Sequence, residues 1–570
     1  MRDRDPIRMT LGKSPDHADL FRSSAAFCDE ALGEHSIYRL LHVEAHRLFP
    51  DESFADLFTA RGRRSIPPRL VAVVMVLQRF EGLSDREAAE HFLFDLRWKY
   101  AAGGLDYDHG SFVHTVLVAM RARLRASARP DRIFEAVLDV AKKAGLVGRR
   151  RVLDSTALYD AVATQDTVTL IRSAICGVLR LADVALTTTL RAGLRRDDAY
   201  DKSGKPTCNW EDAAEREALV DALARDGQAI LARLDGLELG AEPRAASTLL
   251  ATVLGQDLEE RADGVFAIAR RVAPDRVIST VDPEARHGHK TASRGFDGYK
   301  GHLAIDPESE IVTATAVTAA NAGDGSVAEE LFADLVTARP IDASEPAAID
   351  ASEPAARTPQ AAESVAESVA AENGANEPPR PSAQVYGDAS YGSGEVLEKL
   401  ERAGIEANVK VMPPTSRAGC FTQEAFVIDR AAGTATCPAG AVVALRVIQD
   451  GQRADFSAHC EGCTLRDKCT TSPRGRMLNV HPNFELLHGA RRRQRSPEWK
   501  KDYRATRPKV ERKIAHLVRR KHGGRRARVR GRLRVAHDFA LIAAATNLAR
   551  LAVLGVRHAA GAWTAARGRA

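Results

Sequence analysis

Three acidic residues stand where an acid has no ordinary structural purpose. Asp154 interrupts the apolar run 152–158, Asp388 ends the strand-like segment 384–388, and Glu511 lies on a predicted helix within the most basic stretch of the chain. A carboxylate at the end of a buried strand is costly to desolvate unless a cation meets it. Three such carboxylates, if they converge, could hold two Mg²⁺ (or Mn²⁺) ions on a phosphodiester, because hard cations prefer oxygen ligands.

Each acid also has a simpler interpretation. Asp154 could cap a following helix, and Asp388 precedes a turn, where aspartate is common because its side chain bonds to nearby backbone. Arg507 and Glu511 are four residues apart. They could form an exposed ion pair that contributes a few tenths of a kcal/mol.

Two-metal chemistry requires ligands within about 4 Å of each other, so rigid elements must carry the acids. The alternating segments 299–305 and 311–317, joined at 306–310, predict a hairpin. Asp388 follows a predicted strand and precedes a predicted helix from Gly394 to about Ala403. The sequence thus predicts a mixed α/β core with the acids at strand ends and on a late helix.

Residues 1–145 are predicted to form an all-α N-terminal domain. Pro67 and Pro68 indicate a helix start. Gly82 predicts a break, and Ser84 with Glu87 predicts a capping box that opens the next helix. This outline suits a DNA-binding helix-turn-helix or a plain αα-hairpin.

The remaining chain divides by composition. Residues 146–337 are predicted to hold the first part of the core, with a helical insertion at 160–270. The octapeptide at 341–348 recurs at 349–356, and the acidic, alanine-rich segment 338–382 predicts a disordered linker. Residues 383–419 continue the core, 420–485 form a small Cys-rich insertion, and 486–560 form a basic helical part.

The charge is concentrated in one place. The 570-residue chain is 44% hydrophobic and 28% charged, with a net charge of +6. Residues 491–534 hold 20 Lys or Arg and three Asp or Glu, so the rest carries about −11. A single basic segment favours nucleic acid binding, although a solvated basic tail is the alternative. No apolar segment predicts a membrane span or an export signal, which favours a cytoplasmic protein.

Guanidinium and ammonium groups suit phosphate, and we expect DNA contacts from two regions. One surrounds the predicted hairpin and the other follows Glu511, whose helix is expected to continue through residues 519–521. The candidates are Arg286, Lys290, Lys300, His302, Arg519, Arg520, Arg525, Arg526 and Arg528.

Four of the eight cysteines fall within 33 residues, as Cys437, Cys460, Cys463 and Cys469. One Cys-x₂-Cys pair with two further thiols could hold a structural Zn²⁺. The alternatives are free thiols or a ribbon that has lost its metal, and His459 and His481 are possible substitute ligands. The scattered Cys28, Cys176, Cys208 and Cys420 are expected to pack as small side chains.

Taken in order, these motifs resemble the DDE transposases of bacterial insertion sequences, in the branch with a helical N-terminal domain and a Cys-rich insertion. The motifs are 152–156, 282–286, 298–302, 386–391 and the pair Arg507 and Glu511. Many relatives place a tyrosine three residues before the arginine and a lysine seven after the glutamate. Here those positions are Arg504 and Val518, with Tyr503 and Arg519 one residue away.

The resemblance implies an RNase H-like core in which Asp154, Asp388 and Glu511 ligate Mg²⁺ and Arg507 is accessory. It implies cleavage at element ends and joining of the freed 3′-hydroxyl to target DNA. The implied partner is double-stranded DNA, both the terminal inverted repeats and the target. The implied protein is a homo-oligomer at the nucleoid. A non-catalytic DNA-binding regulator and an inactive transposase copy are the alternatives.

Overall fold

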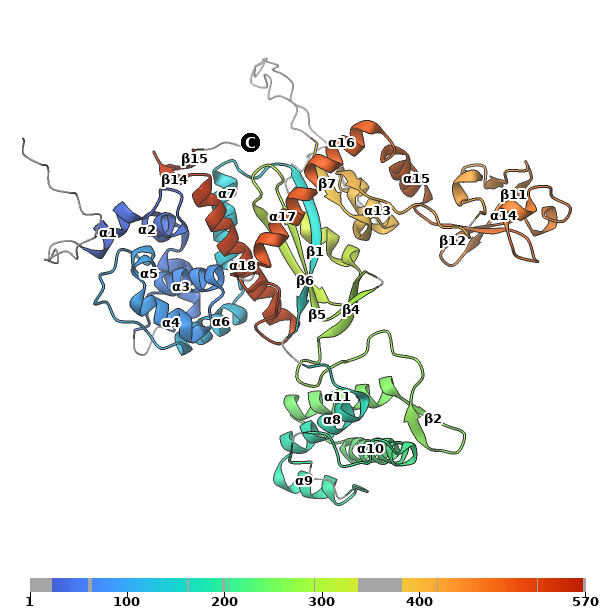
Figure 1. Cartoon of the computed structure of the whole chain (residues 1–570), viewed down its shortest axis with the longest axis horizontal. Coiled ribbons are helices and arrows are strands. Elements are labelled where there is room, and N and C mark those ends of the chain that lie inside the picture. The colour runs from blue at the N-terminus through green and yellow to red at the C-terminus, as the bar shows by residue number, and fades with distance from the viewer. Residues whose placement is uncertain are drawn as a thin grey trace, which may run out of the picture.

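The computed structural model describes residues 23–59, 64–160, 163–196, 200–202, 204–336 except 292, and 382–566 except 418 and 520. The predicted linker 338–382 therefore lies outside the described residues, except for residue 382. In the described part of the chain, no helix is long and apolar enough to cross a membrane. Figure 1 shows three lobes around a central sheet.

The N-terminal region is helical, as predicted. Its α-helices are α1 (Ser24–Ala31), α2 (Ile37–Leu48), α3 (Pro68–Glu81), α4 (Asp85–Phe94), α5 (Leu96–Ala101), α6 (Thr115–Ala126) and α7 (Arg132–Lys143), with a 3-10 helix η1 (Asp51–Leu57). The predicted capping box at α4 is confirmed, because Ser84 Oγ accepts from Glu87 N and Glu87 Oε2 accepts from Ser84 N.

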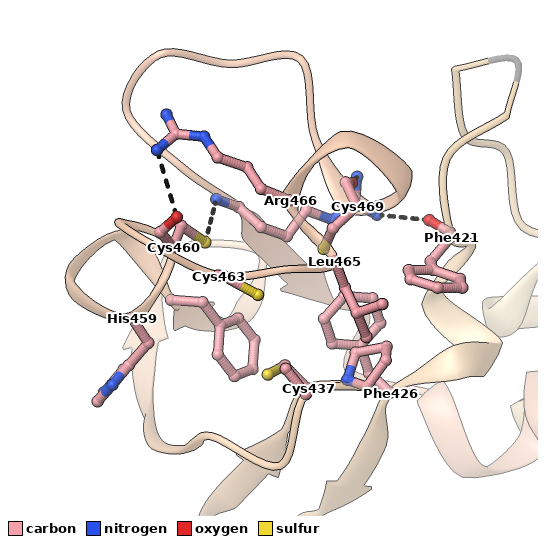
Figure 2. A pocket seen from close by; sticks show the side chains of 13 residues that line it. Phe421, Phe426, Cys437, His459, Cys460, Cys463, Leu465, Arg466 and Cys469 are labelled. Atoms are coloured by element: carbon pink, nitrogen blue, oxygen red, sulfur yellow. Dashed lines mark hydrogen bonds between the residues drawn. The ribbon is translucent and has the colours of Figure 1, made fainter.

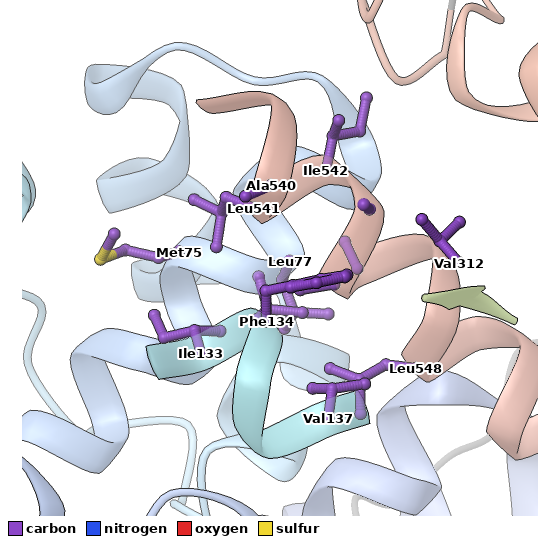
Figure 3. Packing of buried hydrophobic residues seen from close by; sticks show 14 of the residues in the cluster. Met75, Leu77, Ile133, Phe134, Val137, Val312, Ala540, Leu541, Ile542 and Leu548 are labelled. Atoms are coloured by element: carbon purple, nitrogen blue, oxygen red, sulfur yellow. The ribbon is translucent and has the colours of Figure 1, made fainter. Parts of the chain in front are cut away.

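Helix α3 is buried on all sides, with Leu70 to Leu77 each at most 7% exposed. Its neighbours include α18 (Arg532–Val553), which arrives from the other end of the chain, and α18 also packs against α7. Figure 3 shows Leu77, Phe134 and Val137 gathered beside Leu548 of α18. Each such side chain stabilises the fold by roughly 1.5–3 kcal/mol when fully buried. The C-terminal helix therefore completes the N-terminal core.

The turn between α3 and α4 contacts the basic segment directly. Gly82 has φ +73°, a left-handed conformation that favours glycine. A Cβ atom there would lie 2.4 Å from the carbonyl oxygen of Lys521. His522 Nδ1 and Arg528 Nη2 bond to the carbonyls of Phe80 and Leu83. Only glycine permits this close approach.

The central sheet is mixed, as predicted. Its strands are β1 (Arg150–Tyr159), β4 (Arg286–Thr291), β5 (Arg294–Ile305), β6 (Val312–Ala319), β7 (Gln384–Gly387) and β8 (Glu406–Val409). Strands run in the order β4-β5-β1-β7-β8, and β6 also pairs with β5. The pairs β1·β7 and β7·β8 are parallel, whereas β5 is antiparallel to β1, β4 and β6. The predicted hairpin is confirmed as β5 and β6; β4 was not predicted.

Helices cover the sheet and extend from it. Helix α12 (Ala328–Val336) and α13 (Gly394–Arg402) pack with it in a second core. Within the predicted insertion 160–270 lie α8 (Thr167–Leu181), α9 (Val184–Arg191), α10 (Ala213–Leu234) and α11 (Ala241–Asp257), which have a core of their own. They are followed by a short hairpin, β2 (Leu258–Glu260) and β3 (Phe266–Ile268).

The cysteine-rich segment forms a separate antiparallel sheet in the order β13-β12-β11-β10-β9. Its strands are β9 (Val427–Asp429), β10 (Thr434–Thr436), β11 (Val442–Ile448), β12 (Gly451–Asp455) and β13 (Met477–Val480), and α14 (Arg466–Cys469) lies beside them. Figure 1 places this sheet at one end of the molecule, away from β1.

The basic part contains α15 (Phe484–Arg493), α16 (Pro497–Thr506) and α17 (Pro508–Leu517), then α18 and the hairpin of β14 (Val556–Ala559) and β15 (Ala562–Ala565). The expectation that the Glu511 helix continues through residue 521 is wrong, because α17 ends at Leu517. The chain then turns at Gly523, whose φ is +62°. Beyond the turn, Ala527 N donates to Tyr159 O at 2.8 Å, so this segment extends along the end of β1.

Candidate active site

Two aspartates lie at the same edge of the central sheet. Strands β1 and β7 are parallel, with Val152 opposite Tyr386. Asp154 and Asp388 each lie two residues further along, so the register brings them side by side. Strand β1 continues to Tyr159, which excludes the interpretation of Asp154 as a helix cap. Asp388 does bond to the following turn, because its Oδ1 accepts from Ser390 N at 2.9 Å.

The third acid comes from α17, which packs against β1. Pro508 occupies the first turn of this helix, where its missing N–H costs nothing. Glu511 therefore falls in the first helical turn, and its side chain is 63% exposed. Arg507 lies at the junction where α16 ends and α17 begins.

Arg507 contacts all three acids. Its guanidinium Nη2 lies 2.9 Å from Asp154 Oδ1, and Nη1 donates to Asp154 Oδ2 at 3.1 Å. Nη2 is also 3.6 Å from Asp388 Oδ2, and Nη1 is 3.6 Å from Glu511 Oε1. The arginine side chain is 8% exposed, so it is not part of an ordinary surface pair. The structure brings the three predicted acids together around one buried cation, the predicted accessory residue Arg507.

Burial and charge act against each other at this cluster. Burial raises the pKa of Asp154, and the neighbouring Arg507 partly offsets that rise. For Arg507, burial lowers the pKa, but the charge and hydrogen bond of Asp154, together with the charges of Asp388 and Tyr503, more than compensate, so the pKa lies above its usual value. The guanidinium is therefore a permanent positive charge among the three carboxylates.

Tyr503 also reaches the site, although its offset by one residue made a role doubtful from sequence. Its hydroxyl donates to the carbonyl of Gly387, the residue before Asp388, at 3.0 Å. Burial raises its pKa, and the nearby charge of Arg507 lowers it. Tyr503 thus ties α16 to the end of β7.

A cavity of about 280 Å³ opens beside the acids. Asp154 and Glu511 line one part of it, and Lys290, Arg294 and Arg525 line another. Tyr159, Phe296 and Arg525 also line a second hollow, which contains Arg526. Positive side chains therefore border the carboxylates, as a phosphate backbone would require.

The predicted DNA-binding residues differ in their exposure and in their contacts. Lys290, Arg519, Arg525 and Arg526 are exposed. Arg286 is paired with Asp275, and Arg528 donates to Leu83 O. Arg520 lies outside the described residues.

Lys300 and His302 have interior positions. Lys300 Nζ is 2.9 Å from Asp324, and His302 is fully buried between Thr318 and Tyr391. This placement favours an internal role over direct DNA contact. Sequence reasoning missed Asp324, whose one signal was an acid shortly after a predicted strand.

The four clustered cysteines line one small cavity of about 20 Å³. Figure 2 shows their sulfur atoms around it, while the His459 ring points away. Cys460 Sγ accepts from Arg476 N at 3.4 Å. Burial raises the pKa of the Cys469 thiol. His481 lies elsewhere, 3.3 Å from Glu395.

Across the described ranges, no three His, Cys, Asp or Glu side chains lie close enough together to hold a metal ion. At the acidic site the reason is visible, because the Arg507 guanidinium lies between the carboxylates. The donor chemistry nevertheless fits Mg²⁺, since three oxygen donors converge on a single positive charge.

Comparisons with known families bear on two parts of the chain. Residues 436–552 match the family described as "Transposase DDE domain". Residues 31–123 match the family described as "Transposase domain (DUF772)". No curated protein and no solved structure matches the chain. The DDE domain implies an RNase H-like fold, in agreement with the mixed sheet. Together, the two matches support placing the chain among the DDE transposases of the insertion-sequence type.

Proposed function

We propose that this protein cleaves DNA at the ends of an insertion sequence and transfers the freed 3′-hydroxyl into target DNA, using Mg²⁺ or Mn²⁺. One observation carries the proposal: Arg507 gathers Asp154, Asp388 and Glu511 from three distant parts of the chain. A structural ion pair needs one carboxylate. Three carboxylates around one arginine suit a site where a bound metal ion can replace the arginine as their positive partner.

The three carboxylates would hold the metal. When bound, Mg²⁺ would acidify the attacking water or hydroxyl and stabilise charge on the phosphate. Arg507 holds Asp154 and faces the other two acids, which limits their mutual repulsion before DNA arrives. Once its carboxylate partners are otherwise engaged, its two Nη groups can donate to a phosphate as a bidentate pair. Tyr503 keeps the end of β7 in place through Gly387.

The DNA strand would enter along the cavity beside the acids. Lys290 and Arg294 border it from β4 and β5, and Arg525 borders it from the segment paired with β1. These side chains come from rigid or paired backbone, which suits the fixed placement of a phosphodiester. We propose that Arg526 and Arg519 extend this surface.

We further propose that Cys437, Cys460, Cys463 and Cys469 bind a structural Zn²⁺. The support is their common cavity, where four thiols from two loops and α14 face one another. The sulfurs would have to move inward to reach the usual Zn–S distance of about 2.3 Å. Such a site would stabilise the small sheet and take no part in the chemistry at Asp154.

The reaction acts on two element ends, so we propose a homo-oligomer bound to double-stranded DNA at the nucleoid of the cytoplasm. The regulatory alternative predicts DNA binding without cleavage.

The role of α3 and α4 in DNA binding stays a prediction. The exposed face of α4 carries Arg86, Glu87 and Glu90, which is not a basic surface.

The test is metal-dependent nicking of a DNA fragment that contains the element end. We expect wild-type protein to nick it in Mg²⁺ and Asp154→Asn, Asp388→Asn and Glu511→Gln to lose nicking by at least a hundredfold while still binding the DNA. Glu329→Gln, an exposed acid paired with Lys399, is the matched control. Retained nicking by Asp154→Asn would remove Asp154 from the mechanism. Binding without nicking by wild-type protein would favour a regulator or an inactive copy.

A further inference from the structure

A second polar cluster lies on the opposite face of the central sheet from Arg507. Side chains alternate between the faces of a strand, so Ser155 points away from the α17 side that Asp154 faces. Ser155 Oγ donates to Asp324 Oδ2 at 2.6 Å. Asp324 opens the 3-10 helix η2 (Asp324–Val327), which follows β6 after the short loop 320–323, and is 8% exposed. A buried carboxylate thus holds the residue next to Asp154.

Lys300 supplies the matching charge. Its Nζ donates to the other oxygen of Asp324 at 2.9 Å and to Ala322 O at 2.8 Å. Both oxygens of Asp324 therefore have partners, as a buried carboxylate requires. The pair fixes the loop between β6 and η2 against β5. Removing either charge would leave the other buried and unpaired.

His302 begins a second line of contacts on the same face of β5. One ring nitrogen lies 2.9 Å from Thr318 Oγ1 and the other lies 3.2 Å from Tyr391 Oη. Burial lowers the pKa of His302 to about 4, so the ring is neutral and carries a single N–H. Tyr391 is fully buried and ends the 3-10 helix η3 (Ala389–Tyr391), three residues after Asp388.

The two lines of contact meet beneath the active site. Helices η2 and η3 pack together. A Cβ atom at Gly325 of η2 would lie 3.6 Å from the carbonyl oxygen of Ser390 in η3. One line ends at the neighbour of Asp154 and the other ends just beyond Asp388. The first line reaches the Asp154 carboxylate itself, because the backbone N–H of Ser155 donates to Asp154 Oδ1 at 2.8 Å.

We propose that this buried cluster is a positioning network that sets the orientation of Asp154 and Asp388 for metal binding. The proposal rests on the function proposed above, because it assumes that these acids bind Mg²⁺. The positioning network consists of Ser155, Lys300, His302, Asp324 and Tyr391. Groups that support metal ligands from behind typically change metal affinity or activity by 10–100-fold when they are removed.

The test compares Asp324→Asn, Ser155→Ala and Tyr391→Phe with wild-type protein. Mn²⁺ affinity is measured by electron paramagnetic resonance without DNA, and the Mg²⁺ concentration for half-maximal nicking is measured separately. We expect Mn²⁺ affinity to fall and the half-maximal Mg²⁺ concentration to rise by about tenfold or more. Metal-free binding to the element end should stay unchanged, whereas general loss of structure would weaken it too.

Asp334→Asn is the matched control. Its carboxylate accepts a hydrogen bond from Arg151 of β1. Arg151 lies four residues before Ser155, so both side chains are on the same face of the strand. The control should leave Mn²⁺ affinity within about twofold of wild type. Equal Mn²⁺ affinity in the control and the three variants would overturn the proposal. If Asp324→Asn does not fold, the two hydroxyl deletions decide. Wild-type protein that neither binds Mn²⁺ nor nicks DNA would instead contradict the proposed function.

Discussion

The guanidinium of Arg507 holds the carboxylate of Asp154 through both of its terminal nitrogens, at 2.9 and 3.1 Å. The two residues are 353 positions apart in sequence, and both side chains are largely buried. This bidentate contact joins the start of α17 to the middle of β1. It also places a permanent positive charge where a divalent metal is proposed to bind.

Replacing Arg507 with alanine should destabilise the metal-free protein. Asp154 would stay buried without its cation, a change that typically costs about 3–5 kcal/mol. Urea unfolding in a metal-free buffer measures the loss. The double variant Arg507→Ala with Asp154→Asn should recover much of it, because no buried charge then lacks a partner.

The control for that prediction is Arg261→Ala, which breaks an ion pair with Glu217 whose side chains are 48% and 40% exposed. Such a pair is worth roughly 0–1 kcal/mol. If Arg507→Ala cost no more than this control, the contact with Asp154 would be energetically unimportant.

Buried His302 should make the folded state sensitive to mild acid. Its folded pKa of about 4 lies below the ordinary value of 6.5. Between these values the unfolded chain binds the proton more readily, so stability falls as pH falls from 6.5 towards 4. The loss should reach roughly 3 kcal/mol at most. Asp324 favours the protonated ring and Lys300 opposes it.

Unfolding midpoints of wild type and His302→Gln at several pH values check this expectation. Wild-type protein should lose more stability on acidification than the glutamine variant. Parallel curves for the two proteins would show that His302 does not stay neutral in the fold.

DNA binding should depend steeply on salt through the exposed residues beside the cavity. Lys290→Ala and Arg525→Ala should each weaken binding and reduce the slope of log affinity against log salt by about one. Fluorescence anisotropy at several salt concentrations measures both quantities. Arg180→Ala, an exposed arginine on α8, should change neither. An unchanged slope in both cavity variants would place the DNA elsewhere.

Purified protein should contain about one zinc ion per chain, because four thiols surround one cavity. Elemental analysis tests this. Cys463→Ser should lose the metal and lower the unfolding temperature, whereas Cys208→Ser in the helical insertion should do neither. Protein without zinc, together with a neutral Cys463→Ser variant, would mean that the thiols are free.

The sequence predicted those features that depend on local signals. The capping box of Ser84, the hairpin of β5 and β6, and Asp154 on a strand all follow from patterns within a few residues. The end of α17 at Leu517 was not predicted, because the basic residues 519–521 are compatible with a continuing helix. Long-range features could not be predicted in the same way.

Arg507 illustrates the difference. Its four-residue spacing from Glu511 was visible, but contact with Asp154 and Asp388 depends on the packing of α17 against β1. The burial of Lys300 and His302 likewise depends on η2 and η3, which cover them from later segments. Charge alone suggested a surface role for both residues. Asp324 belongs to none of the sequence motifs, and only its bonds to Ser155 and Lys300 in the structure indicate a role.

The packing of α18 against α3 and α7 determines when, during synthesis, the N-terminal region can finish folding. A ribosome must finish residue 553 and release it from the exit tunnel before the first seven helices can close around their missing partner. Until then α3 exposes a strongly apolar side, so an incomplete nascent chain would lack a finished N-terminal half. A protein truncated before α18 should aggregate rather than persist as a smaller competitor of the full-length form.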